Sequence, residues 1–299
     1  MIAMVVGVGD LLTHPFMRHA LLAGIPVAAL SGLVGYFMVL RSQVFTGDAL
    51  SHVAFSGALG ALAIGIDPRW GLFGATIAVG IALGLLGNRG RADDVVIGTV
   101  FAWVLGLGVL ALSVYASTAH AAQSGAAGVS VLFGSILGLS LGQAVTAAVL
   151  SIGLVGLVVV IGRPLLFATL DSAVAAARGV RVRPLDVGFL ALVGATAALA
   201  TQAVGALLLL GLLSAPAGAA RRLTARPYVA LWLSSGLAAT SMLVGLVVAY
   251  VVPAVPPSFA VVATAATAYA LAVLATVRPQ RRTRSLAGSY IGRSDTVTG

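Results

Sequence analysis

The sequence predicts an all-α, polytopic integral membrane protein: a bundle of about eight or nine membrane-spanning helices. Three observations predict this class. The 299 residues are 60% hydrophobic and only 8% charged, whereas a soluble domain carries about 25% charged residues. The mean hydropathy is +1.10, and a soluble chain of this length could not bury so much apolar surface. The apolar residues also fall into runs of roughly 17–25 residues, the length that crosses a bilayer as a helix.

Nine apolar runs divide residues 1–278, which we expect to form one transmembrane domain. The seventh run is short and ends beside Pro216, so it predicts a half-helix or a tilted continuation of the run before it. A further stretch, Gly128–Leu139, is too short to cross and predicts a re-entrant or interfacial helix on the outer side. In order, the runs are Ala20–Leu40, Val44–Gly65, Trp70–Gly87, Val95–Ala116, Gly142–Ile161, Leu185–Thr201, Val204–Ala217, Val229–Val251 and Phe259–Val277.

The arginines set the expected orientation, because cytoplasmic connections carry an excess of basic residues. They fall on alternate connections, and Arg18 is the exception. This alternation predicts that the C-terminus lies in the cytoplasm and the N-terminus outside. The final segment, residues 279–299, is rich in Arg and Ser. We expect it to be a disordered, basic cytoplasmic tail that either attracts anionic lipid or only fixes the topology. The arginines on inner connections are Arg41, Arg89, Arg91, Arg163, Arg178, Arg181, Arg183, Arg221, Arg222 and Arg226.

The charged residues exclude several function classes. All 17 basic residues are Arg and all 8 acidic residues are Asp. Without Lys the chain cannot form the phosphate-binding loop of a P-loop ATPase, whose lysine reaches the β- and γ-phosphates. Without Cys it has no disulfides, thiolate metal ligands or cysteine nucleophiles. In a membrane chain, the net charge of +9 indicates arginine-rich cytoplasmic connections rather than a nucleic-acid partner.

Asp48 and His52 are the strongest candidates for a functional site. They lie four residues apart in the predicted span Val44–Gly65, so they share one face of the helix. Burying an ionisable group in a membrane is costly, so such residues usually face a cavity, a pore or a partner. A carboxylate oxygen with an imidazole nitrogen suits Mn²⁺, Fe²⁺ or Zn²⁺. If these residues line a path for metal ions through the membrane, Ser51 and Ser56 are candidates for further polar groups along it.

Two structural alternatives compete with a metal site. Asp48 could cap a helix that starts later, and His52 could bond a neighbouring carbonyl group. Two ligands are also too few for tight zinc binding. They suit a transient, partly hydrated site or one that two copies of the chain complete. On the opposite face, Gly57, Ala61 and Gly65 recur every fourth residue, which predicts close packing with another helix.

The longest inner connection, Arg163–Pro184, contains a predicted short helix. Asp171 or Ser172 can cap its N-terminus, strong helix formers follow, and Gly179 can end it in the left-handed conformation. The helix is either an amphipathic connector on the membrane surface or a lever that another protein pushes. In the second case the coupling residues are Asp171, Ser172, Ala175, Ala176, Arg178 and Gly179.

Five segments together resemble the metal-specific permease family of bacterial ATP-binding-cassette (ABC) importers. They occur in the family's order over about residues 16–278, and Gly-Asp-Ala-Leu-Ser-His is the most specific motif. Two departures occur: the coupling segment has Asp-Ser-Ala where the family commonly has Asp-Pro-Glu, and no histidine cluster surrounds His120. The segments are LRSQVFTGDALSHVAFSGALG (40–60), RADDVVIG (91–98), VLFGSILG (131–138), LDSAVAAARGV (170–180) and VGALLLLGLLSAPAGAAR (204–221).

The resemblance implies the permease fold of a type II ABC importer, in the inner or plasma membrane of a bacterium. It implies that the chain is not itself an enzyme and holds no permanent cofactor. Its substrate would be Mn²⁺, Zn²⁺ or Fe²⁺, delivered by an extracytoplasmic binding protein. Its partners would be two copies of an ATPase subunit, membrane lipid and a second permease, most simply another copy of itself. Asp48 and His52 would line the translocation path.

Two other functions remain open from the sequence. A proton-coupled secondary transporter would use Asp48 and His52 as a proton relay and would need no ATPase. A membrane enzyme acting on lipid would use them as an acid–base pair. The enzyme needs further polar groups at the same depth, and the predicted spans offer few.

Overall fold

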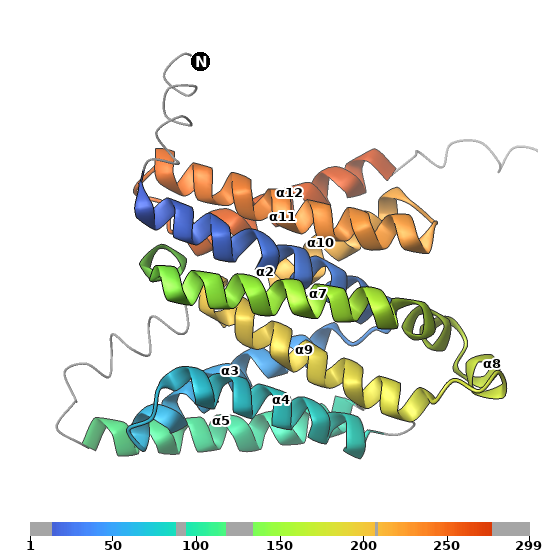
Figure 1. Cartoon of the computed structure of the whole chain (residues 1–299), viewed down its shortest axis with the longest axis horizontal. Helices are drawn as coiled ribbons and strands as arrows, with labels where there is room; N and C mark the ends of the chain where they lie inside the picture. Colours follow the sequence, from blue (N-terminus) through green and yellow to red (C-terminus); the bar gives the residue numbers. More distant parts are fainter. Residues whose placement is uncertain (1–13, 88–93, 118–133, 207–208, 277–299) are drawn as a thin grey trace, which may run out of the picture.

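The chain forms a bundle of long α-helices, seen in the computed structural model of Figure 1, which describes residues 14–87, 94–117, 134–206 and 209–276. No strand occurs within these residues. The long helices run alongside one another, and the short helix α8 lies at one end (Figure 1). The helices are α2 (Pro15–Leu40), α3 (Val44–Ala63), α4 (Pro68–Leu86), α5 (Asp94–Ser117), α7 (Leu141–Leu170), α8 (Ser172–Ala177), α9 (Val182–Val204), α10 (Leu209–Leu223), α11 (Pro227–Val251) and α12 (Pro257–Thr276), with a 3-10 turn, η2, at Ile136–Gly138.

The predicted membrane-protein class is confirmed. Among the described residues, seven helices are long and apolar enough to cross a membrane: α2, α4, α5, α7, α9, α11 and α12. Two other helices, α3 and α10, do not meet this description. At 15 residues, α10 is shorter than the roughly 20 residues that a span needs. The 20 residues of α3 include Asp48 and His52, which lower its hydropathy.

The seventh predicted run is placed wrongly. Val204, where we expected it to begin, is the last residue of α9, and α10 begins at Leu209 and passes through Pro216 to Leu223. The break follows Gly205, whose φ of 91° is open to glycine and strained for other residues. The neighbouring Gly134 is also required, because a Cβ there would lie 2.7 Å from the carbonyl oxygen of Ala203.

The C-terminal end of α7 also extends further than predicted. The expected span ended at Ile161, but α7 continues through Arg163 and Pro164 to Leu170. Leu165 and Leu166 lie in the buried core, and this packing offsets the hydrogen bond that the proline removes. The connection between α7 and α9 therefore spans only residues 171–181, rather than the predicted 163–184.

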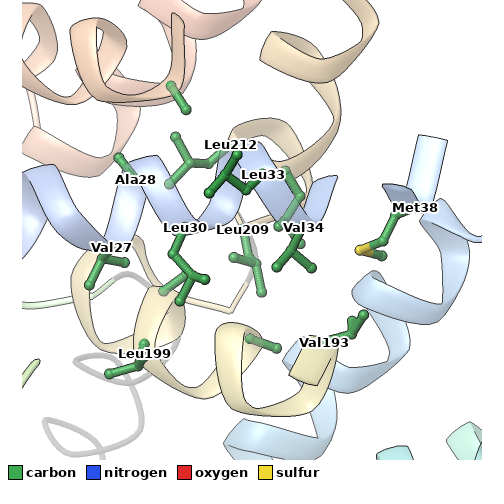
Figure 2. Close-up of a cluster of buried hydrophobic side chains, with 14 of the residues drawn as sticks. Val27, Ala28, Leu30, Leu33, Val34, Met38, Val193, Leu199, Leu209 and Leu212 are labelled. Carbon is green, nitrogen blue, oxygen red and sulfur yellow. The ribbon is translucent and has the colours of Figure 1, made fainter. Parts of the chain in front are cut away.

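The core lies where α2 meets α9 and α10. In the most apolar stretches of α2 and α9, 72% of the residues are buried, whereas the share in α5 is 11%. Helix α5 packs chiefly on α3, at the edge of the bundle (Figure 1). Membrane-embedded helices associate through close van der Waals packing rather than hydrophobic exclusion from water. Figure 2 shows the centre of this packing, where α2 contributes Val27, Ala28, Leu30, Leu33, Val34 and Met38, α9 contributes Val193 and Leu199, and α10 contributes Leu209 and Leu212.

The predicted small-residue face of α3 packs closely on α4. A Cβ on Gly57 would collide with the carbonyl oxygen of Gly71, and a Cβ on Gly71 would lie 2.6 Å from the Cβ of Ala61. Only small residues permit this approach. Gly65, the third predicted member, has open space around it and a φ of 75°, so it serves the turn after α3 instead.

Candidate functional site

Asp48 lies inside α3, in its second turn. The helix begins at Val44 after Gln43, so Asp48 does not cap its N-terminus, which corrects the capping alternative. The side chain of Asp48 is partly exposed. Within the described part of the chain, no group donates a hydrogen bond to its carboxylate, and only its main-chain carbonyl accepts one, from Ser51 Oγ at 2.6 Å. The carboxylate oxygens are therefore available to a ligand.

His52 lies one turn further along α3 and is also partly exposed. Its ring meets the ring of Phe101 on α5 edge-on, with centroids 5.3 Å apart and planes at 66°. Edge-to-face contacts of this kind fix the orientation of a ring without using its polar atoms. The contact of His52 is thus with an aromatic ring rather than with the neighbouring carbonyl group of the structural alternative.

The two side chains lie on a strip of α3 that the rest of the described chain leaves partly exposed. We define the α3 strip as Phe45, Asp48, His52 and Phe55, all exposed or partly exposed. Their spacing of three and four residues places them on one helix face. The intervening residues, such as Leu50 and Val53, are buried, so the strip is the partly exposed face of the N-terminal half of α3.

The two serines lie elsewhere. Ser51 is fully buried and bonds the main chain of its own helix. Ser56 is 7% exposed and lies against Gly108 of α5, where any added Cβ would collide with its hydroxyl. The structure thus brings Asp48 and His52 together on the α3 strip and turns both hydroxyls towards neighbouring main chain.

The ligand chemistry of the α3 strip is incomplete within one chain. No group of three or more His, Cys, Asp or Glu side chains that could hold a metal ion occurs among the described residues. One carboxylate and one imidazole supply an oxygen and a nitrogen ligand, which first-row divalent metals accept. Water or a second copy of the chain would have to complete the coordination.

The short helix predicted in the connection Arg163–Pro184 is confirmed as α8. The Asp171 carboxylate accepts hydrogen bonds from the main-chain N–H groups of Ala173 (3.0 Å) and Val174 (2.9 Å), so Asp171 rather than Ser172 is the cap. Gly179 has a φ of 85°, the left-handed conformation that ends a helix. The chain therefore has a short, rigid element between two long helices.

The predicted coupling residues divide by exposure. Asp171, Ser172, Ala176, Arg178 and Gly179 are exposed, and the Arg178 guanidinium lies 5.9 Å from the ring centroid of Phe167. Ala175 is 0% exposed and anchors α8 to its own chain. The sequence-based prediction did not include Val174, an apolar side chain that is 42% exposed on α8. Val174 is the one large apolar residue in the α8 segment SAVAAA, and this contrast in size could have identified it.

A cavity of about 130 Å³ lies beside the C-terminal half of α3, where Ala58 lines it. Its lining includes Arg69 at the start of α4, Gln143 at the start of α7, and Thr201 and Gln202 near the end of α9. Neither Asp48 nor His52 lines it. The cavity is formed by segments far apart in the sequence, which is why no local pattern predicted it.

Comparisons with known proteins agree with this arrangement. Residues 13–276 match the family model described as the ABC 3 transport family. The chain is 30% identical over 269 residues to a manganese transport system membrane protein of Halalkalibacterium halodurans, covering 88% of each protein. It is 30% identical over 205 residues to a chelated iron transport system membrane protein of Yersinia pestis, covering 68% of this chain and 66% of that protein.

A solved structure shares the fold. The structure described as PsaBC from Streptococcus pneumoniae in complex with Fab contains a chain that is 26% identical to this one, with a TM-score of 0.75. The similarity covers 91% of this chain and 95% of that chain. The helical arrangement in Figure 1 is thus an arrangement already seen by experiment.

Proposed function

Because the chain belongs to the ABC 3 transport family, as a membrane permease of an ABC metal importer, we propose that it carries Mn²⁺ inward, with Fe²⁺ as a second substrate. The main observation behind this proposal is the partly exposed α3 strip, on which the Asp48 carboxylate and the His52 imidazole can each offer an atom to a metal ion. An oxygen and a nitrogen ligand without thiolate fit these ions. The names of the manganese and iron relatives support the same choice.

The translocation path, in this proposal, lies between two copies of the permease. One copy offers two ligands, and two copies related by a twofold axis would bring two Asp48–His52 pairs towards each other. Weak, incomplete coordination suits transport, because an ion must leave each site as readily as it enters. The partly exposed rings of Phe45 and Phe55 would border the site with apolar surface.

The energy would come from a separate ATPase subunit, in two copies. The chain contains no Lys, so it lacks the residue that a P-loop ATPase uses on its phosphates. The exposed residues Ser172, Val174 and Ala176 on α8 would contact the ATPase. ATP binding and hydrolysis would then shift the permease between outward-open and inward-open states, and an extracytoplasmic binding protein would deliver the ion.

Transport in proteoliposomes tests this function. The permease is reconstituted with its ATPase subunit and binding protein, and uptake of radioactive Mn²⁺ is measured with ATP, without ATP, and with ATP plus a protonophore. We expect uptake that requires ATP and survives the protonophore. Uptake that persists without ATP but collapses with the proton gradient would instead establish a proton-coupled transporter.

A further inference from the structure

A buried ion pair joins segments that are far apart in the sequence. Arg41 Nη1 lies 2.6 Å from Asp186 Oδ1, and the two side chains are 1% and 4% exposed. The Arg41 Nε–H donates to Thr169 Oγ1 at 2.9 Å, and the guanidinium carbon lies 4.7 Å from the ring centroid of Phe189. We define Arg41, Thr169 and Asp186 as the Arg41 cluster.

The cluster touches both flanks of α8. Thr169 is in the last turn of α7, two residues before the cap residue Asp171. Asp186 is near the start of α9, on the other side of the α8 connection. α8 itself packs on α7 and α9. A displacement of α8 therefore acts first on the two helix ends that hold Thr169 and Asp186.

Arg41 connects those helix ends to the α3 strip. It ends α2, and α3 begins only three residues later at Val44, with Asp48 in the next turn. In this linker Ser42 has a φ of 56°, a conformation that a non-glycine residue adopts only when its surroundings hold it there. So short and constrained a linker passes a movement of Arg41 to α3 with little slack.

Stability alone does not account for the cluster. Replacing a buried ion pair with well-packed apolar residues is often neutral or stabilising, because both charges lose their hydration. Unlike an apolar side chain, a guanidinium makes directional hydrogen bonds. Its planar set of donors fixes the relative positions of the groups that it bonds. The Arg41 cluster bonds the end of α2 to the end of α7 and the start of α9, a directional link that apolar side chains would not supply.

We propose that the Arg41 cluster is the coupling element of this permease: Arg41, Thr169 and Asp186 are positioning residues that transmit movement of α8 to α3 and so to Asp48 and His52. The proposal rests on the proposed function. It assigns these residues no contact with the metal ion. Their loss should separate ATP hydrolysis from metal movement without removing either site.

The test uses the reconstituted complex of permease, ATPase and binding protein, with ATP hydrolysis and radioactive Mn²⁺ uptake measured on the same vesicles. The main variant is Arg41→Met with Asp186→Leu, which removes both charges together. We expect it to assemble with the ATPase and melt at or above the wild-type temperature. Its Mn²⁺ uptake per ATP hydrolysed should fall by about 3- to 30-fold, the range for mutations within a coupling network.

A second variant guards against failed assembly. Thr169→Val removes the acceptor of the Arg41 Nε–H and leaves the ion pair in place. Uptake per ATP should therefore fall, and the melting temperature should fall modestly because a buried donor loses its partner. Its matched control is Thr267→Val on α12, an exposed threonine whose hydroxyl bonds a carbonyl one turn away, as the hydroxyl of Thr169 also does. The control should keep the wild-type ratio.

The outcomes separate the two claims. Wild-type vesicles without ATP-dependent Mn²⁺ uptake would refute the proposed function. If the wild type transports and the double variant keeps its uptake per ATP, the coupling role is refuted. The role is also refuted if hydrolysis and uptake fall together at constant ratio. Should the double variant not assemble, Thr169→Val decides: an unchanged ratio there overturns the proposal.

Discussion

At the scale of single residues, the location of Asp48 and His52 is what supports their proposed role as metal ligands. Each lies on the α3 strip, partly exposed, while most of their neighbours on α3 are buried. An ionisable group in a membrane is costly unless it meets water, an ion or a partner. No described residue donates a hydrogen bond to the carboxylate of Asp48, which fits the proposed role of that carboxylate as a metal ligand.

His52→Ala should abolish metal uptake. Losing a metal ligand costs more than losing the group that orients one, which already costs about 10- to 100-fold, so Mn²⁺ uptake should fall at least about 100-fold. Membrane insertion and ATPase co-purification should stay unchanged, because the ring contacts Phe101 only at the edge of the bundle. Normal uptake would contradict the assignment.

Asp48→Asn should produce a similar loss, because the amide keeps the shape of the carboxylate and removes its charge. No described hydrogen bond depends on that charge, so the melting temperature in detergent should change by less than a few degrees. Ser51→Ala is the control, because its hydroxyl bonds only the main chain of α3. A loss seen only as poor expression would argue for a structural role.

At the scale of helices, α8 has one buried face and one exposed face. Ala175 is fully buried against its own chain, whereas Ala176 is exposed. Adjacent positions on a helix point about 100° apart, so one position anchors α8 and the next is free to meet a partner. The same division applies to α3, whose Gly57 face packs on α4 while the α3 strip is partly exposed.

Bulky substitution should distinguish the two faces of α8. Ala176→Leu should weaken stimulation of ATP hydrolysis by the binding protein and leave the melting temperature unchanged, since the new side chain extends towards the ATPase. Ala175→Leu should instead destabilise the permease by about 1–3 kcal/mol through overpacking. Thermal melts and hydrolysis rates on the two variants check this, and identical behaviour of the pair would contradict the assigned faces.

At the scale of the whole molecule, charge and exposure are both unevenly distributed. The guanidinium of Arg221 donates to the carbonyl of Val39 at 3.0 Å, close to Arg41 and the α8 connection. We therefore expect this end of the bundle to face the cytoplasm, by the distribution of positive charge. Helix α5 is mostly exposed at one edge (Figure 1), where lipid or a second copy would cover it.

A second copy should meet the α3 strip. The sequence contains no cysteine, so a single introduced cysteine gives an unambiguous result. Phe45→Cys, at a position that is 51% exposed, should yield a covalent dimer with a short bifunctional maleimide in native membranes. Trp232→Cys on α11, 53% exposed, is the matched control and should remain monomeric. The reverse pattern would place the dimer interface on α11.

Much of the molecule follows from local sequence. Runs of apolar residues predicted the long helices, since a helix in lipid satisfies its own backbone hydrogen bonds and its length must match the bilayer. Asp171 and Gly179 predicted the ends of α8 from capping chemistry, and the four-residue spacing placed Asp48 and His52 on one face. The Gly128–Leu139 prediction is described only from Gly134 onward, where η2 forms. The predictions for the tail at 279–299, for the location of the N-terminus and for the surroundings of His120 concern residues outside those that the structure describes.

The sequence by itself determined the membrane class, most helices, the α8 caps and the pair of candidate ligands, because each depends on groups within a few residues of one another. Tertiary structure alone decided that the α3 strip stays partly exposed, that α7 continues past Pro164, and that Arg41 meets Asp186, 145 residues away. These depend on which helix faces pack together. Helix packing in a membrane is chosen by close contact between distant segments, and no local pattern encodes that choice.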